Sequence, residues 1–201
     1  MPSSNRTPAA GLTEAPLVRA AARGDLPDWA VASAPRRAHM QRVATLLGEW
    51  AERLGLADDE RIEWSALGYL HDALRDAPPA QLRAEVEEEF RDLHGLLLHG
   101  PAAARRLEGD LHPELVNAIR YHTLGHSSLD RVGKALYLAD FLEPGRTFEF
   151  AARGELLRRM PEELDSVLVE VVAARIGHLL DRRIPIRPET AAFWSAIVEP
   201  G

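Results

Sequence analysis

The chain has 201 residues, of which 46% are hydrophobic and 27% charged, and its formal charge is −7 at pH 7. This composition predicts one globular domain with a sizeable core. The negative charge argues against a general nucleic-acid binder, and no apolar run approaches the roughly 20 residues of a membrane helix. The absence of cysteine excludes disulfides and thiolate metal sites. We therefore expect a cytoplasmic protein without nucleic-acid or membrane partners.

The N-terminal part of the chain differs in character from the rest. Residues 1–12 are rich in Pro, Ser, Asn, Thr and Gly, and this composition predicts a mobile tail. The pattern from Leu17 to Arg23 predicts a short helix that ends at Gly24. We expect residues 1–34 to form a partly disordered extension and residues 35–198 to form the functional domain.

Helical periodicity dominates the remaining sequence. Apolar residues recur at intervals of three and four from Pro35 to Leu54, which predicts a helix whose core side carries His39. A second helix is expected to run to Leu70, with Asp58 as its N-cap. Further helices are expected around residues 99–106, 115–122, 129–142, 149–160, 161–182 and 188–198. No useful strand pattern and no internal repeat is present, so the predicted fold is an all-α helical bundle with extra C-terminal helices.

Several polar side chains border these apolar patterns. His71 and Asp72 directly follow the mostly apolar stretch 66–70, so both are expected to be buried. Such groups are costly to bury unless they are satisfied, and a metal ion satisfies them well. Four further residues lie at the edges of helical patterns: His39, His99, His122 and Asp140. Taken singly, each is more simply explained as an ordinary core or surface residue, but together they indicate a metal site.

The order of these residues resembles that of the HD superfamily of metal-dependent phosphohydrolases. The segments NAIRYHTLG at 117–125 and YLADFLEPGR at 137–146 are similar to two segments of one of its families. That family is the bacterial HD-domain symmetrical diadenosine tetraphosphate hydrolases of the YqeK type. Arg36, three residues before His39, also fits, and the resemblance spans roughly residues 35–195.

The resemblance implies hydrolysis of diadenosine tetraphosphate to two ADP by a metal-bridged hydroxide. It also implies two divalent transition metal ions, with iron as the metal, although the ligand types alone permit manganese, cobalt or zinc. A first metal would be held by His39, His71, Asp72 and Asp140. A second would be held by His99 and His122, with Asp72 as the bridging, catalytic carboxylate.

Three residues are candidate substrate contacts. Arg146 resembles a phosphate clamp with a catalytic role, because a guanidinium can hold two phosphate oxygens at once; the alternative is a salt bridge to Glu143. Arg75 occupies a position where many HD enzymes have lysine, and arginine can bind phosphate but cannot act as a general acid. Thr123 follows His122 and is expected to order the second metal's surroundings.

Two alternative functions stay open at this point. The chain could be an HD phosphohydrolase that acts on another nucleotide, such as a deoxynucleotide or a nucleoside monophosphate, because substrate pockets lie outside the motifs. It could also be a non-catalytic HD module that senses nucleotides; the complete ligand set argues against this, and Arg75 in place of lysine argues for it. The expected partner is a small nucleotide in every case. The sequence does not indicate whether the protein is a monomer or an oligomer.

Overall fold

The computed structural model describes residues 16–145 and 150–199. This part of the chain contains ten α-helices, two 3-10 helices and no β-strand. The α-helices are α1 (Pro16–Ala22), α2 (Ala34–Arg53), α3 (Asp58–Leu70), α4 (Pro79–Glu85), α5 (His99–Leu107), α6 (Pro113–Tyr121), α7 (Arg131–Leu142), α8 (Phe150–Arg159), α9 (Leu164–Asp181) and α10 (Pro188–Val198). The 3-10 helices are η1 (Glu88–Phe90) and η2 (Gly95–Leu97). The predicted all-α class is confirmed.

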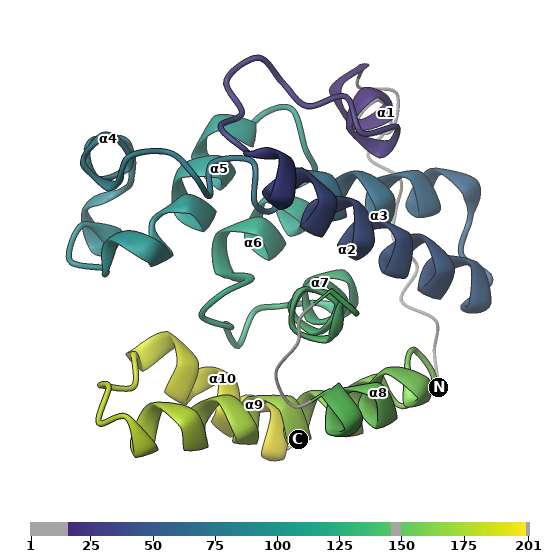
Figure 1. Cartoon of the computed structure of the whole chain (residues 1–201), viewed down its shortest axis with the longest axis vertical. Helices are drawn as coiled ribbons and strands as arrows, with labels where there is room; N and C mark the ends of the chain where they lie inside the picture. Colours follow the sequence, from purple (N-terminus) through teal and green to yellow (C-terminus); the bar gives the residue numbers. More distant parts are fainter. Residues whose placement is uncertain (1–15, 146–149, 200–201) are drawn as a thin grey trace.

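Helix α7 lies at the centre of the molecule. Figure 1 views it end-on, between the α2–α3 pair and the layer formed by α8, α9 and α10. It contacts α2, α3, α6, α8 and α9, and ten of its 12 residues are buried. A helix that is apolar on nearly every side is stable only when other elements cover it. Asp140, close to the end of this helix, is therefore carried into the interior.

Helices α2 and α3 form a hairpin whose two arms approach closely at Gly68. A Cβ atom at Gly68 would overlap the backbone of Ala44, so no larger residue fits without a shift of the helices. The close crossing brings the ring of His39 on α2 to 5.4 Å from that of His71, measured between ring centroids. A glycine in α3 thus sets the distance between two polar residues that lie far apart in the sequence.

The start of α3 differs from the prediction by one residue. Asp58 is the first helical residue, and Ala57 occupies the N-cap position, so the expected Asp58 cap is wrong. The side chain of Glu60 accepts a hydrogen bond from the N–H of Ala57 at 3.3 Å. Asp58, Asp59 and Glu60 place three carboxylates in the first turn, where they interact favourably with the helix dipole.

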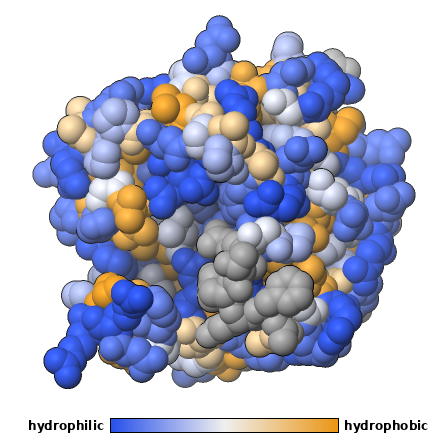
Figure 2. Space-filling view, in the orientation of Figure 1, coloured by the Kyte–Doolittle hydropathy of each residue, from blue (hydrophilic) through white to orange (hydrophobic). Residues whose placement is uncertain are grey.

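The N-terminal helix is part of the packed molecule. Helix α1 packs against α3, and its residues Val18 and Ala21 belong to the hydrophobic core. The predicted mobile tail at 1–12 lies outside the described residues. The face shown in Figure 2 is largely hydrophilic, with scattered apolar side chains. None of the described helices combines the length and apolar character that a bilayer span requires.

Candidate metal centre

The six side chains predicted as metal ligands lie together in one buried cluster. Each is at most 8% exposed. They are contributed by α2, by the end of α3, by the start of α5, by the end of α6 and by α7, in the order His39, His71 with Asp72, His99, His122 and Asp140. Five separate elements must pack correctly before these groups meet.

The two carboxylate oxygens of Asp72 face different pairs of imidazoles. Its Oδ2 lies 3.5 Å from Nε2 of His39 and 3.6 Å from Nε2 of His71. Its Oδ1 lies 3.0 Å from Nε2 of His99 and 3.6 Å from Nε2 of His122. The cluster therefore divides into a first group on the Oδ2 side and a second group on the Oδ1 side, with Asp72 common to both.

Asp140 completes the first group. Its Oδ1 lies 3.1 Å from Nε2 of His39. One donor atom from each of His39, His71 and Asp140 lies within 4.8 Å of the others, and the same holds for His71, Asp72 and His122. Both sets have the compactness that a shared cation requires, and His71 lies where the two groups meet.

Hydrogen bonds at Nδ1 turn the imidazoles toward the carboxylates. Three rings donate to the carbonyl oxygen three residues earlier: His71 to Gly68 (2.9 Å), His99 to Leu96 (3.0 Å) and His122 to Ile119 (2.7 Å). Because a carbonyl only accepts, the hydrogen of each neutral ring lies on Nδ1 and Nε2 keeps its lone pair. The buried Nε2 atoms of His39 and His71 have no hydrogen bond of acceptable geometry. Orphaned ring nitrogens in a polar cluster are what a metal ion would satisfy, so the residues present fit such an ion.

Burial and the carboxylates oppose each other in the first group. Burial lowers the pKa of His39, but the neighbouring Asp140, Asp72 and Glu143 outweigh it, so that the pKa is raised above 6.5. Burial lowers the pKa of His71 to about 4, and the charge of Asp72 offsets only part of this effect. His71 is therefore neutral near pH 7, which is the form that binds a metal.

Asp72 is ionised within the cluster. Burial alone would raise its pKa, yet the charge of His71 when that ring is protonated, and hydrogen bonds from the protonated rings of His122 and His99, hold the pKa well below 3.8. Arg36 adds a hydrogen bond from Nη1 to Oδ2 of Asp72 at 2.6 Å. From the sequence, Arg36 stood out only because its place three residues before His39 fits the family resemblance, and this contact was not predicted.

Glu143 is a further buried carboxylate at the edge of the cluster. It accepts hydrogen bonds from Nε of Arg42 at 2.5 Å and from the N–H of Gly145 at 2.8 Å, and its Oε1 lies 3.2 Å from Nδ1 of His39. Sequence reasoning missed both Glu143 and Arg42 as site residues; their spacing from Asp140 and His39 by one helical turn was the available signal. Arg146 lies outside the described residues, so its predicted phosphate contact and the alternative salt bridge to Glu143 stay predictions.

The other two predicted substrate contacts lie beside the cluster. Arg75 is half-buried, and its charge adds to burial in lowering the pKa of His99. Within the described residues its guanidinium has neither a hydrogen bond nor an ion pair. The backbone carbonyl of Thr123 accepts a hydrogen bond from Arg175 at 2.8 Å. Arg75 thus provides a cation near the second group, and Thr123 fixes the turn that follows α6.

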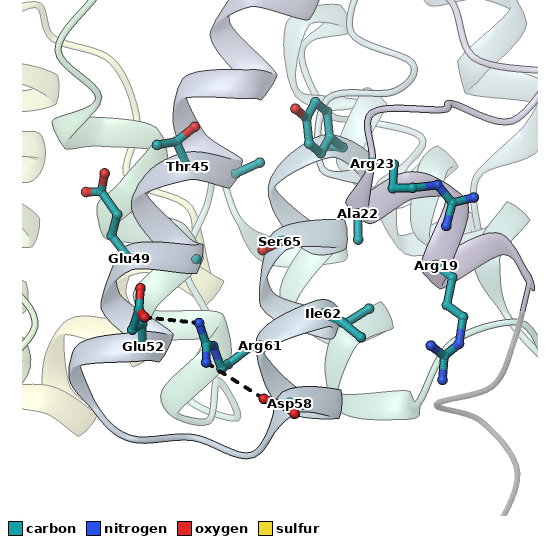
Figure 3. A pocket seen from close by; sticks show the side chains of 13 residues that line it. Arg19, Ala22, Arg23, Thr45, Glu49, Glu52, Asp58, Arg61, Ile62 and Ser65 are labelled. Atoms are coloured by element: carbon teal, nitrogen blue, oxygen red, sulfur yellow. Dashed lines mark ion pairs between the residues drawn. The ribbon is translucent and has the colours of Figure 1, made fainter.

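A wider hollow of about 780 Å³ lies elsewhere, between α1, α2 and α3. None of the six clustered residues lines it. Figure 3 shows Arg61 in this hollow between Glu52 and Asp58, at 3.3 and 3.7 Å. Because its cations are balanced by adjacent carboxylates, the hollow provides no concentrated charge for an anionic ligand.

The chain is similar to known proteins in sequence and in fold. Residues 36–145 match the HD domain family, and this segment contains all six clustered residues. The symmetrical bis(5'-nucleosyl)-tetraphosphatase of Bacillus subtilis is 28% identical over 81% of this chain and 89% of its own length. Proteins of the same name from Halalkalibacterium halodurans and Staphylococcus aureus are 26% and 25% identical, over 71% and 76% of this chain and 78% and 81% of theirs.

The fold also has a counterpart among solved structures. A crystal structure from Clostridium acetobutylicum, described as a predicted HD superfamily hydrolase involved in NAD metabolism, matches with a TM-score of 0.69. The two chains are 22% identical, and the match covers 80% of this chain and 87% of the other. The bundle, including part of its C-terminal helices, is therefore a known arrangement.

Proposed function

This chain belongs to the HD domain family, and we propose that it hydrolyses diadenosine tetraphosphate symmetrically to two molecules of ADP. An HD domain implies binding of divalent metal and phosphohydrolase chemistry. The substrate is proposed because the three relatives named for this activity align with most of the chain. We further propose that the reaction takes place in the cytoplasm and that the partners are small nucleotides.

The two carboxylate oxygens of Asp72 face two separate imidazole groups, and the proposed chemistry depends on this arrangement. We propose that the first metal is held by His39, His71, Asp72 and Asp140, and the second by His99 and His122 with Asp72 shared. A carboxylate that presents one oxygen to each of two sites could serve two cations at once. When bound, the cations would act as Lewis acids and lower the pKa of a water between them. Iron is the proposed metal, and the nitrogen and oxygen donors also suit manganese, cobalt or zinc.

Cationic side chains on both sides of the cluster support an anionic substrate. Arg36 contacts Oδ2 of Asp72, whereas Arg75 acts electrostatically on His99 of the second group. A guanidinium can hold two phosphate oxygens in a fixed geometry, so Arg75 suits a polyphosphate that crosses the cluster, whereas Arg36 is already paired with Asp72. Arg146 and Thr123 are kept as proposed substrate contacts.

The proposed reaction consumes one water. The water oxygen forms a bond to one of the two central phosphorus atoms, and the bond from that phosphorus to the bridging oxygen breaks. The bridging oxygen leaves as part of the second ADP. Arg75 stays protonated, so it would stabilise charge on the phosphate oxygens and cannot supply a proton to the leaving group.

A nucleotide panel with chromatographic separation of products tests this function. The metal-loaded protein should convert diadenosine tetraphosphate to ADP and act more slowly on deoxynucleotides and nucleoside monophosphates. Faster turnover of a mononucleotide would favour a different HD phosphohydrolase. Tight binding of the tetraphosphate without turnover, under metals that fill both sites, would favour a nucleotide-sensing module.

A further inference from the structure

Glu143 has an almost fully buried side chain, and within residues 16–145 it lies at hydrogen-bonding distance from Arg42, Gly145 and His39. It follows the last residue of α7 and is 2% exposed. A buried carboxylate is costly unless it is paired and hydrogen-bonded. Arg42 from α2 and the N–H of Gly145 donate to Oε2, while Oε1, which Nη2 of Arg42 also reaches at 3.5 Å, lies 3.2 Å from Nδ1 of His39. The arrangement holds Glu143 in one orientation.

His39 needs such a partner because of its place in a helix. His71 and His122 directly follow the last residues of α3 and α6, and His99 comes two residues after η2. The last carbonyls of a helix have no partner within it, and each Nδ1 donates to one of them. His39 is the sixth residue of α2, so the carbonyls of the preceding turn are engaged in helical hydrogen bonds. Its Nδ1 reaches instead to Glu143, 104 residues away.

We propose that Glu143 is the positioning residue of His39, and that Arg42 and the backbone N–H of Gly145 hold Glu143 in that role. The inference rests on the proposed metal centre. A hydrogen bond to a charged acceptor is about twice as strong as one to a neutral acceptor. The hydrogen bond to Glu143 therefore fixes the orientation of the His39 ring and makes its Nε2 a stronger metal ligand. The residue of the cluster that Glu143 contacts at hydrogen-bonding distance is His39 of the first group, so its effect is expected on that group.

Titration of metal-free protein with Co²⁺ alone, followed by visible absorbance, tests this role without measuring activity. The unaltered protein should bind two ions. Glu143→Gln keeps the size of the side chain but replaces one of the two acceptor oxygens by an NH₂ group. The glutamine can therefore accept either from His39 or from Arg42 and Gly145, but not from all three. It should weaken one of the two sites by about 10–100-fold, the usual cost of losing such a partner. Glu49→Gln, an exposed carboxylate on α2, is the control and should titrate like the unaltered protein.

A second background identifies the affected site. In His99→Ala, which removes a ligand of the second group, adding Glu143→Gln should weaken the remaining site by the same factor. Arg42→Gln leaves Glu143 in place, so it should weaken the same site in the same direction and by less. If circular dichroism shows that Glu143→Gln does not fold, the Arg42→Gln variant tests the positioning role in its place.

The possible outcomes separate this inference from the proposed function. An unaltered protein with two Co²⁺ sites and a Glu143→Gln variant of equal affinity would overturn the positioning role alone. Equal weakening of both sites would also overturn it, because the effect would then not pass through His39. An unaltered protein that binds no Co²⁺ would overturn the metal centre and this inference with it.

Discussion

Asp72 is the residue on which the proposed chemistry depends. Each of its oxygens faces a separate pair of imidazoles, so removal of its charge acts on both groups at once. We predict that Asp72→Asn, which preserves the shape of the side chain, loses both metals and nearly all hydrolysis. Metal analysis after dialysis measures the content. A variant that retains two metals per chain would contradict a shared carboxylate.

The pKa values of the imidazoles predict which metal is lost first on acidification. In metal-free protein the pKa of His39 is raised above 6.5, whereas the pKa of His71 is lowered to about 4 and that of His99 is also lowered. Below the pKa of His39, a metal in the first group must displace a proton from that ring. Its affinity should then fall about tenfold per pH unit, one proton being released for each metal bound.

The second group should keep its affinity to lower pH, because protons compete for His99 only below its ordinary range. Co²⁺ titrations between pH 8 and pH 5 give the slope for each site. Earlier loss of the second site, or a slope of two protons for the first, would contradict these pKa directions.

Arg75 is predicted to act on substrate and not on metal. We expect Arg75→Ala to leave metal content unchanged and to reduce kcat/KM by roughly 10–100-fold, since a hydrogen bond to a charged group contributes about 1.5–3 kcal/mol. Arg75→Lys should restore part of the loss, because it returns the charge without the planar fork. Arg91→Ala, at an exposed arginine, is the control. A loss of metal in Arg75→Ala would show a structural role instead.

At the scale of the helices, Gly68 determines how closely α2 and α3 approach. A Cβ at this position would overlap the backbone of Ala44, so Gly68→Ala should lower the free energy of unfolding by about 1–3 kcal/mol, the usual cost of overpacking. Gly177→Ala in α9 is the matched control, because nothing lies within 4 Å of its added Cβ. That change should raise stability by about 0.5–1 kcal/mol. Urea unfolding of both variants checks the prediction, and equal effects would contradict it.

The helices themselves were largely predictable from the sequence. Apolar spacing located α2 to within one residue at each end, and the edges of such patterns correctly marked the positions of His71, His99 and His122. The cap of α3 was not predicted, because the side chain of Glu60 reaches back to Ala57 in place of an Asp58 cap. Local patterns do not reveal which of several neighbouring polar residues makes the contact.

At the scale of the whole molecule, motif order predicted which residues meet, and packing determined how they meet. All six clustered residues lie within the segment that matches the family. The separate directions of Oδ1 and Oδ2 of Asp72 depend on how α2, α5 and α6 pack around α3, which periodicity does not encode. The contact between Glu143 and His39 joins residues 104 positions apart, and for the same reason it was missed.

In the proposed reaction, one water divides diadenosine tetraphosphate at its centre. Hydrolysis by metal-loaded protein in water enriched in ¹⁸O, with the products weighed by mass spectrometry, shows where the water oxygen goes. We predict ADP as the only product, with one ¹⁸O atom in the terminal phosphate of half of the ADP molecules. ATP and AMP as the main products would contradict symmetrical cleavage, and ADP without ¹⁸O would contradict attack by water.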